Sequence, residues 1–154
     1  MLSFASIPRS ALWLGLAGLL PFFWGVGTTY IPALHTLTME TVGPRYVAPF
    51  VLLNYGQIIL AFMSGVIWGF AARATGAVQV IGFALSVVPA LWAFFFVGGG
   101  PTSAAIYLIA GFVGLLLIDA FFWRHALAPT WWMALRIPLT ALVCASLAVP
   151  AFLT

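Results

Sequence analysis

The chain has 154 residues, of which 65% are hydrophobic and 5% are charged, and its net charge is +3 at pH 7. A water-soluble domain carries about 25% charged residues, so this composition excludes an ordinary soluble protein. The five cationic residues are single arginines without a basic run, so the positive charge does not predict binding to nucleic acid.

Five apolar stretches, each of about 20 residues, are long enough to cross the bilayer core of about 30 Å. The connections between them are too short to fold alone. We therefore expect an all-α fold, a polytopic membrane protein in which a bundle of five transmembrane helices forms one domain over residues 1–154. The expected helices cover approximately residues 10–30, 47–72, 77–97, 103–123 and 130–152.

The first apolar stretch follows Arg9 and resembles a signal peptide, with Gly25 and Gly27 in the pattern of a cleavage site. We expect it instead to remain as the first transmembrane helix, with a kink at Pro21. Further along, three consecutive glycines and Pro101 predict a firm break between the third and fourth helices.

The arginines predict the orientation. With five spans, the N-terminus shares one side with Arg9, Arg73, Arg124 and Arg136, whereas Arg45 lies on the opposite side. Because cytoplasmic loops carry an excess of positive charge, we expect a cytoplasmic N-terminus and a C-terminus on the other side of the membrane.

Small residues recur every fourth position on the second helix, at Ala61, Gly65 and Gly69. Such a stripe lets another backbone approach closely, and in lipid this packing drives helix association. We expect it to contact a neighbouring helix of the same chain, and the alternative is contact with a different subunit.

On the same helix, Asn54 and Gln57 are expected to form hydrogen bonds across helices, with a substrate role as the alternative.

Of the two acidic residues in the sequence, Asp119 lies inside a predicted span, where an unpaired carboxylate is costly. Arg136 and Arg73 lie at a matching depth, and we expect a structural Asp119–Arg136 ion pair. A proton relay is the alternative, although no chain of Asp, Glu or His continues toward the outer face.

The sequence predicts neither a cofactor nor an enzyme. His35 and His125 fall in connections on opposite sides, and Cys144 is alone inside the last span, whereas a metal site needs three or four N, O or S ligands. Phosphate-binding glycine loops and nucleophile motifs are absent from the sequence. The expected partners are membrane lipids and other integral-membrane subunits.

Several short motifs together resemble the transmembrane protein 69-like family of small multi-span proteins. They are Gly15-Leu16-Ala17-Gly18-Leu19-Leu20-Pro21-Phe22, Tyr55-Gly56, Ile59-Leu60, Phe62, Gly65, Trp68-Gly69, Ser86-Val87-Val88-Pro89, Asp119, Trp132 and Leu135-Arg136-Ile137-Pro138-Leu139-Thr140. The resemblance implies a five-helix bundle in the inner (plasma) membrane of a bacterium, or alternatively in the mitochondrial inner membrane. It implies no activity. For the bacterial membrane, the orientation predicted from the arginines puts the C-terminus in the periplasm.

These patterns lead to a functional hypothesis. We expect a non-catalytic accessory subunit or assembly factor of a larger inner-membrane complex, respiratory or photosynthetic, which acts through helix–helix packing. The alternative is a small homo-oligomeric transporter or channel, for which the prolines at positions 21 and 89 are candidate helix breaks.

Overall fold

The computed structural model describes residues 6–153, and within this range the chain forms helices and no strands. The helices are α1 (Arg9–Ala17), α2 (Leu20–Tyr30), α3 (Pro32–Thr41), α4 (Phe50–Ala71), α5 (Gly76–Phe96), α6 (Pro101–Arg124) and α7 (Trp132–Ala148). A 3₁₀ turn at Pro44–Tyr46 precedes α4, and a π-helical turn at Val149–Leu153 follows α7. The all-α prediction is confirmed.

Within residues 6–153, five helical segments are long and apolar enough to cross a membrane. They are Arg9–Tyr30, Phe50–Ala71, Gly76–Phe96, Pro101–Arg124 and Trp132–Leu153. The predicted polytopic bundle of five transmembrane helices is therefore confirmed. The observed boundaries lie within a few residues of the expected ones, because runs of apolar residues end where charges, glycines and prolines begin.

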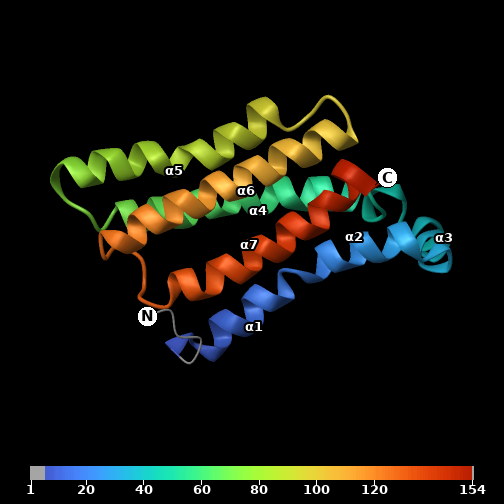
Figure 1. Cartoon of the computed structure of the whole chain (residues 1–154), viewed down its shortest axis with the longest axis horizontal. Coiled ribbons are helices and arrows are strands. Elements are labelled where there is room, and N and C mark those ends of the chain that lie inside the picture. Colours follow the sequence, from blue (N-terminus) through green and yellow to red (C-terminus); the bar gives the residue numbers. More distant parts are fainter. Residues whose placement is uncertain (1–5, 154) are drawn as a thin grey trace.

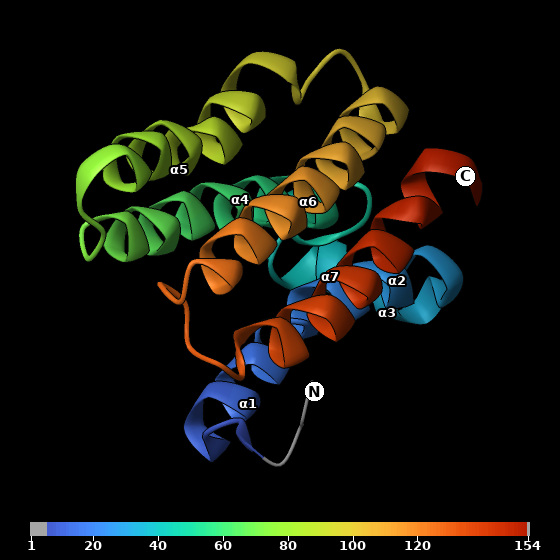
Figure 2. The same cartoon turned by 60° about the vertical axis from the view of Figure 1, so that its left-hand side comes forward.

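The helices lie side by side in the bundle (Figure 1). Helix α4 packs against α5 and α6, α6 packs against α7, and the α1–α2 segment lies along α7 and α4. The turned view shows α1 and α2 beside α7, on the side of the bundle away from α5 (Figure 2). The start of α1 and the α4–α5 and α6–α7 connections lie at one end, and α3, the α5–α6 turn and the C-terminal turn lie at the other (Figure 1).

The first span is broken into two helices. Helix α1 ends at Ala17, and α2 begins at Leu20 with Pro21 in its first turn. A proline has no N–H to donate to the carbonyl four residues earlier, here that of Ala17, and its ring crowds that carbonyl. The sequence predicts a kink at Pro21, and the structure has a break between Ala17 and Leu20, just before the proline.

A second proline, Pro89, lies inside α5 without ending the helix. The amide of the next residue, Ala90, donates a hydrogen bond to the Oγ of Ser64 on α4 at 2.9 Å. Prolines are tolerated in membrane helices when a neighbouring side chain satisfies the backbone groups around them. Ser64 has this role here, and the hydroxyl of Ser86 donates within its own helix to the Phe83 carbonyl at 2.8 Å.

The core lies where α2, α4, α6 and α7 meet, and its largest fully buried apolar side chains are Phe22, Phe112, Phe122, Leu52, Leu60, Ile67, Leu108, Leu115 and Leu147. Helix α2 approaches α4 at a glycine: a Cβ atom on Gly25 would lie 2.6 Å from Cγ of Leu52. Close approach at small residues is the usual basis of helix packing in lipid. Gly25 therefore sets the distance at which α2 lies against α4.

Candidate functional site

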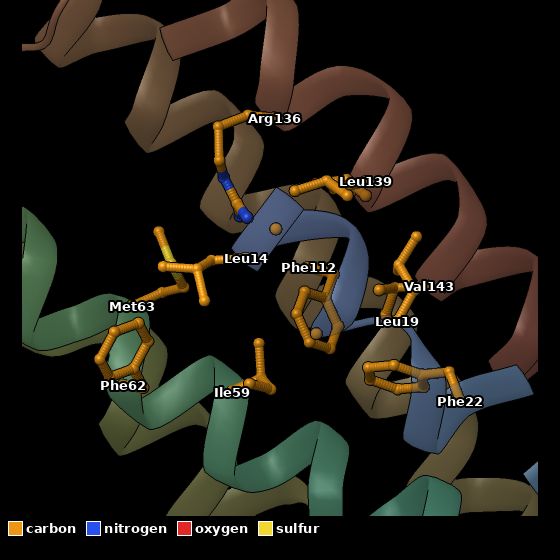
Figure 3. Close-up of a pocket in the computed structure, with 13 residues that line it drawn as sticks. Leu14, Leu19, Phe22, Ile59, Phe62, Met63, Phe112, Arg136, Leu139 and Val143 are labelled. Carbon is orange, nitrogen blue, oxygen red and sulfur yellow. The ribbon is translucent and has the colours of Figure 1, made fainter. Parts of the chain in front are cut away.

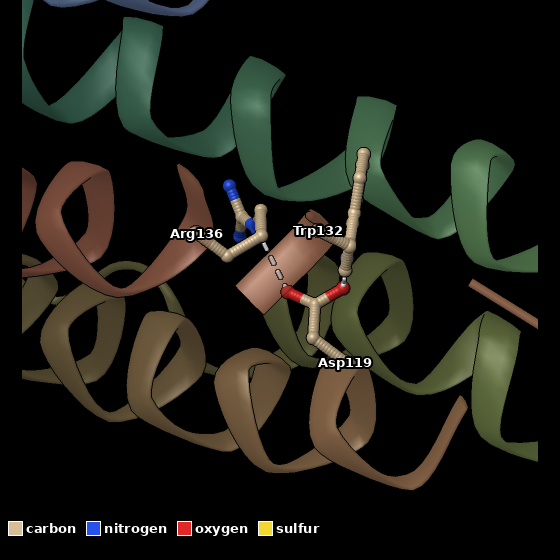
Figure 4. Close-up of polar contacts among 3 residues, drawn as sticks. All are labelled: Asp119, Trp132 and Arg136. Carbon is tan, nitrogen blue, oxygen red and sulfur yellow. Dashed lines mark hydrogen bonds and ion pairs between the residues drawn. The ribbon is translucent and has the colours of Figure 1, made fainter. Parts of the chain in front are cut away.

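The centre of the polar chemistry is a buried ion pair between α6 and α7. Asp119, which is 0% exposed, accepts a hydrogen bond at Oδ2 from Nε of Arg136 at 2.8 Å, and Arg136 is itself only 7% exposed (Figure 4). Two opposite charges at this distance in a medium of low dielectric constant attract strongly, which offsets the cost of removing both from water. The structure thus brings the two residues of the predicted pair together.

A third side chain completes this cluster. Trp132, at the start of α7, donates from Nε1 to the other carboxylate oxygen of Asp119, Oδ1, at 2.8 Å (Figure 4). Its indole ring also packs edge-on against Phe70 of α4, with 5.1 Å between the ring centroids. Asp119 therefore holds α6 to α7 through both oxygens, and Trp132 extends this connection to α4.

The contact of Trp132 with Asp119 was missed by sequence reasoning. Trp132 lies near the end of a span, where an indole is usually an interfacial anchor. The available signal was the spacing of Trp132 and Arg136, because residues four apart lie on the same face of a helix. Two hydrogen-bond donors on one face of α7 together match the two oxygens of a single carboxylate.

The other candidate partner of Asp119, Arg73, is exposed, and its Nη1 lies 3.4 Å from the carbonyl oxygen of Leu127.

Arg136 is buried and paired, so it does not contribute to the surface charge used to predict orientation. Arg136 lies in the second turn of α7, so three of the four arginines expected to share the side of the N-terminus are exposed. The exposed arginines in the described residues are then Arg9, Arg73 and Arg124 at one end of the bundle and Arg45 at the other.

The small-residue stripe of α4, formed by Ala61, Gly65 and Gly69, is exposed. A Cβ atom added to Gly65 or to Gly69 would meet no other atom of the described chain within 4 Å. Within residues 6–153, Gly65 and Gly69 therefore do not make the expected contact with a neighbouring helix of the same chain, whereas Ala61 borders a recess between α4 and α5. The opposite face of α4 makes that contact instead: a Cβ atom on Gly56 would lie 3.0 Å from Cδ1 of Leu108 on α6.

The two amide side chains on α4 differ in their contacts. Gln57 donates from Nε2 to the carbonyl of Val97, the residue after α5, at 3.2 Å, which is a hydrogen bond between neighbouring segments. Asn54 is half-buried in a recess beside Arg45 and Tyr46, and within residues 6–153 its side chain forms no hydrogen bond. The prediction of an interhelical bond is thus met by Gln57 and not by Asn54, which lies in the second turn of α4.

The remaining candidate ligands lie apart. His35 lies with Nδ1 3.3 Å from the carbonyl of Thr28, and His125 with Nδ1 2.8 Å from the carbonyl of Phe121. Cys144 is half-buried on α7. In residues 6–153, no group of three or more His, Cys, Asp and Glu side chains is close enough to hold a metal ion.

Comparison with known proteins gives consistent matches. Residues 7–152 match the family described as "Protein of unknown function (DUF3429)". The chain is 35% identical over 148 residues to "Transmembrane protein 69" of Xenopus tropicalis, covering 91% of the chain and 53% of the relative. It is 32% identical over 150 residues to "Transmembrane protein 69" of Mus musculus, covering 95% of the chain and 57% of the relative. The chain thus spans little more than half of these relatives, and no solved structure gives a significant match.

Proposed function

We propose that this chain, which belongs to the transmembrane protein 69-like family (DUF3429), is a non-catalytic accessory subunit or assembly factor of a larger inner-membrane complex. The observation that carries the proposal is the open face of α4 at Gly65 and Gly69. The proposed occupant of this face is a transmembrane helix of another subunit.

The physical argument rests on what drives association in lipid. Lipid tails are as apolar as leucine, so an exposed leucine gains little by leaving lipid for protein, whereas a flat glycine surface gains close van der Waals contact with a second backbone. Gly65 and Gly69 lie one turn apart on the outside of the bundle, with the exposed side chains of Phe62 and Trp68 beside them. A partner helix would lie along the glycines and pack against these two aromatic side chains.

The alternative is a small homo-oligomeric transporter or channel. The break between α1 and α2 is the feature that favours it, since transporters use broken helices at their binding sites. Two groups that a transport path would use, the hydroxyls of Ser64 and Ser86, already form hydrogen bonds within the bundle. This favours the accessory role over the transport role.

We place the protein, as part of the same proposal, in the inner (plasma) membrane of a bacterium, with the N-terminus in the cytoplasm and the C-terminus in the periplasm; the mitochondrial inner membrane is the alternative. The distribution of exposed arginines supports this orientation. One end of the bundle, where the N-terminus lies, has Arg9, Arg73 and Arg124, and the other end has Arg45.

The test is purification of the tagged chain from native membranes in a mild detergent, followed by a native gel and mass spectrometry. We expect co-migration with other membrane subunits in a fixed ratio, and we expect Gly65→Leu to abolish it. Gly114→Leu on α6 is the matched control, because a Cβ atom there also meets nothing within 4 Å. Recovery of the chain alone, or as a homo-oligomer, contradicts the proposal, as does equal loss of partners in both variants.

A further inference from the structure

A cavity of about 170 Å³ lies between α1, α2, α4, α6 and α7, at the break between the first two helices. Most of its lining is apolar and includes Phe22, Met63 and Phe112, which come from three different helices. Figure 3 shows these side chains around one space, with the guanidinium group of Arg136 directed toward it from α7. We call this space the Arg136 cavity.

Two residues that line this cavity each have a buried polar atom without a hydrogen-bond partner. Within residues 6–153, Nη2 of Arg136 and Oγ1 of Thr140 have no hydrogen-bond partner. The two residues are 7% and 4% exposed and both line the cavity. They are four residues apart, so they lie one above the other on the same face of α7. Buried polar groups are normally hydrogen-bonded, so this pair of donors points to a bound acceptor.

The charge of the site restricts the acceptor. The guanidinium of Arg136 is already neutralised by Asp119 at 2.8 Å, so an anionic ligand would add an uncompensated charge inside the bundle. An uncharged carbonyl oxygen has two lone pairs and accepts from both donors without adding charge. The chemistry therefore favours a neutral carbonyl compound over a carboxylate or a phosphate.

The size and position of the cavity restrict the rest of the ligand. An apolar cavity of about 150 Å³ is enough to hold a benzene ring. Leu14 and Phe62, which border the Arg136 cavity, are 75% and 64% exposed and so lie at its lipid-facing edge. A ring or a short length of acyl chain fits inside, and a longer apolar tail would leave past these two residues into the bilayer.

We infer that the Arg136 cavity binds a neutral, membrane-soluble carbonyl compound, whose oxygen accepts hydrogen bonds from Arg136 Nη2 and Thr140 Oγ1 and whose apolar part contacts Phe22 and Phe112. A quinone ring and the ester of an acyl lipid share this chemistry, and the two are separated by experiment. The site shares Phe62 with the face of α4 proposed for the partner helix, but its polar groups on α7 and its lining from α2 and α6 are separate from that face.

The experiment is equilibrium binding to the full chain in nanodiscs of ether-linked phospholipid, which contribute no ester carbonyl of their own. Four radiolabelled probes are compared: a decyl-substituted benzoquinone, methyl decanoate, decanoate and decane. We expect saturable binding of the quinone, of the ester or of both. Binding of the quinone alone assigns a ring ligand, and binding of the ester alone assigns an acyl lipid.

The diagnostic variant is Thr140→Val, which keeps the shape of the side chain and removes its hydroxyl. Loss of one neutral hydrogen bond is expected to weaken binding of the carbonyl probe about 2- to 10-fold. Thermal stability without probe should not fall, since the variant removes an unpaired buried hydroxyl. Thr38→Val on α3 is the control, because Thr38 is equally buried but its hydroxyl donates to the Leu34 carbonyl at 2.7 Å.

A second variant, Val143→Phe, fills the cavity from α7 and should abolish binding of the probe, while a melting transition shows that the chain still folds. The inference is overturned if decane binds as well as the carbonyl probes, or if decanoate binds more tightly than its methyl ester. It is also overturned if none of the four probes binds, or if Thr140→Val and Thr38→Val bind the carbonyl probe equally well.

Discussion

Nε of Arg136 on α7 donates to Oδ2 of Asp119 on α6 across 2.8 Å, at a point where the carboxylate is completely buried. The two residues are 17 positions apart, on consecutive helices joined by a short connection. Each charge is tolerated inside the bundle because the other is there. The stability of the bundle should therefore respond very differently to loss of one partner and to loss of both.

Asp119→Leu should lower the free energy of unfolding by about 3–5 kcal/mol, because it leaves the Arg136 guanidinium buried without its counter-charge. The double variant Asp119→Leu/Arg136→Met should recover most of this loss, since an apolar pair of similar size needs no compensation. Reversible unfolding in mixed detergent micelles, followed by tryptophan fluorescence, measures both. If the double variant is as unstable as the single one, the loss of stability does not come from an uncompensated charge on Arg136.

Trp132→Phe should cost about 1.5–3 kcal/mol, which is typical of a hydrogen bond to a charged group. The reason is the loss of the donor to Asp119 Oδ1, while the aromatic contact with Phe70 is largely kept. The same unfolding assay applies, with Trp13→Phe at an exposed position of α1 as the control. In an Asp119→Leu background the effect of Trp132→Phe should nearly vanish; an undiminished effect would mean that the indole acts through packing.

Gly25→Ala should destabilise the bundle by about 1–3 kcal/mol through overpacking. The added Cβ atom would lie 2.6 Å from Cγ and 2.7 Å from Cδ2 of Leu52, so α2 must move away from α4. Gly69→Ala is the control in the same assay, because its Cβ atom enters open space and the substitution favours the helix. Equal stability of the two variants would contradict the close packing of α2 on α4.

The orientation is testable by labelling with a membrane-impermeant maleimide, after Cys144→Ala removes the native thiol. His125→Cys reports the α6–α7 connection, and Thr102→Cys reports the opposite end, at the start of α6. In intact bacterial cells with a permeabilised outer membrane we expect labelling at position 102 and protection at position 125. The reverse pattern would overturn the proposed cytoplasmic N-terminus.

Much of the architecture was predictable because lipid imposes simple rules. A backbone in hydrocarbon must satisfy its own hydrogen bonds, so each apolar run of about 20 residues becomes a helix. The breaks at Pro21 and at the glycines before Pro101 follow from local backbone chemistry and were expected from the chain. The match between Asp119 and Arg136 was also predictable, because few charges are available inside the spans.

The facing direction of each helix was not predictable in the same way. In lipid, both sides of a helix are apolar, so hydrophobic periodicity does not distinguish the buried face from the exposed one. The stripe at Gly65 and Gly69 was therefore interpreted as an internal contact, whereas the glycines that meet side chains of a neighbouring helix include Gly25, Gly56, Gly82 and Gly111.

By itself, then, the sequence determined the class of the protein, its five spans and the pairing of its buried charges, because each follows from the cost of exposing polar groups to hydrocarbon. The rotation of each helix about its axis was decided by tertiary packing. That rotation directs Trp132 to Asp119, turns Gly65 outward and leaves Arg136 and Thr140 beside one cavity. It depends on how side chains from several helices fit together, which no single segment specifies.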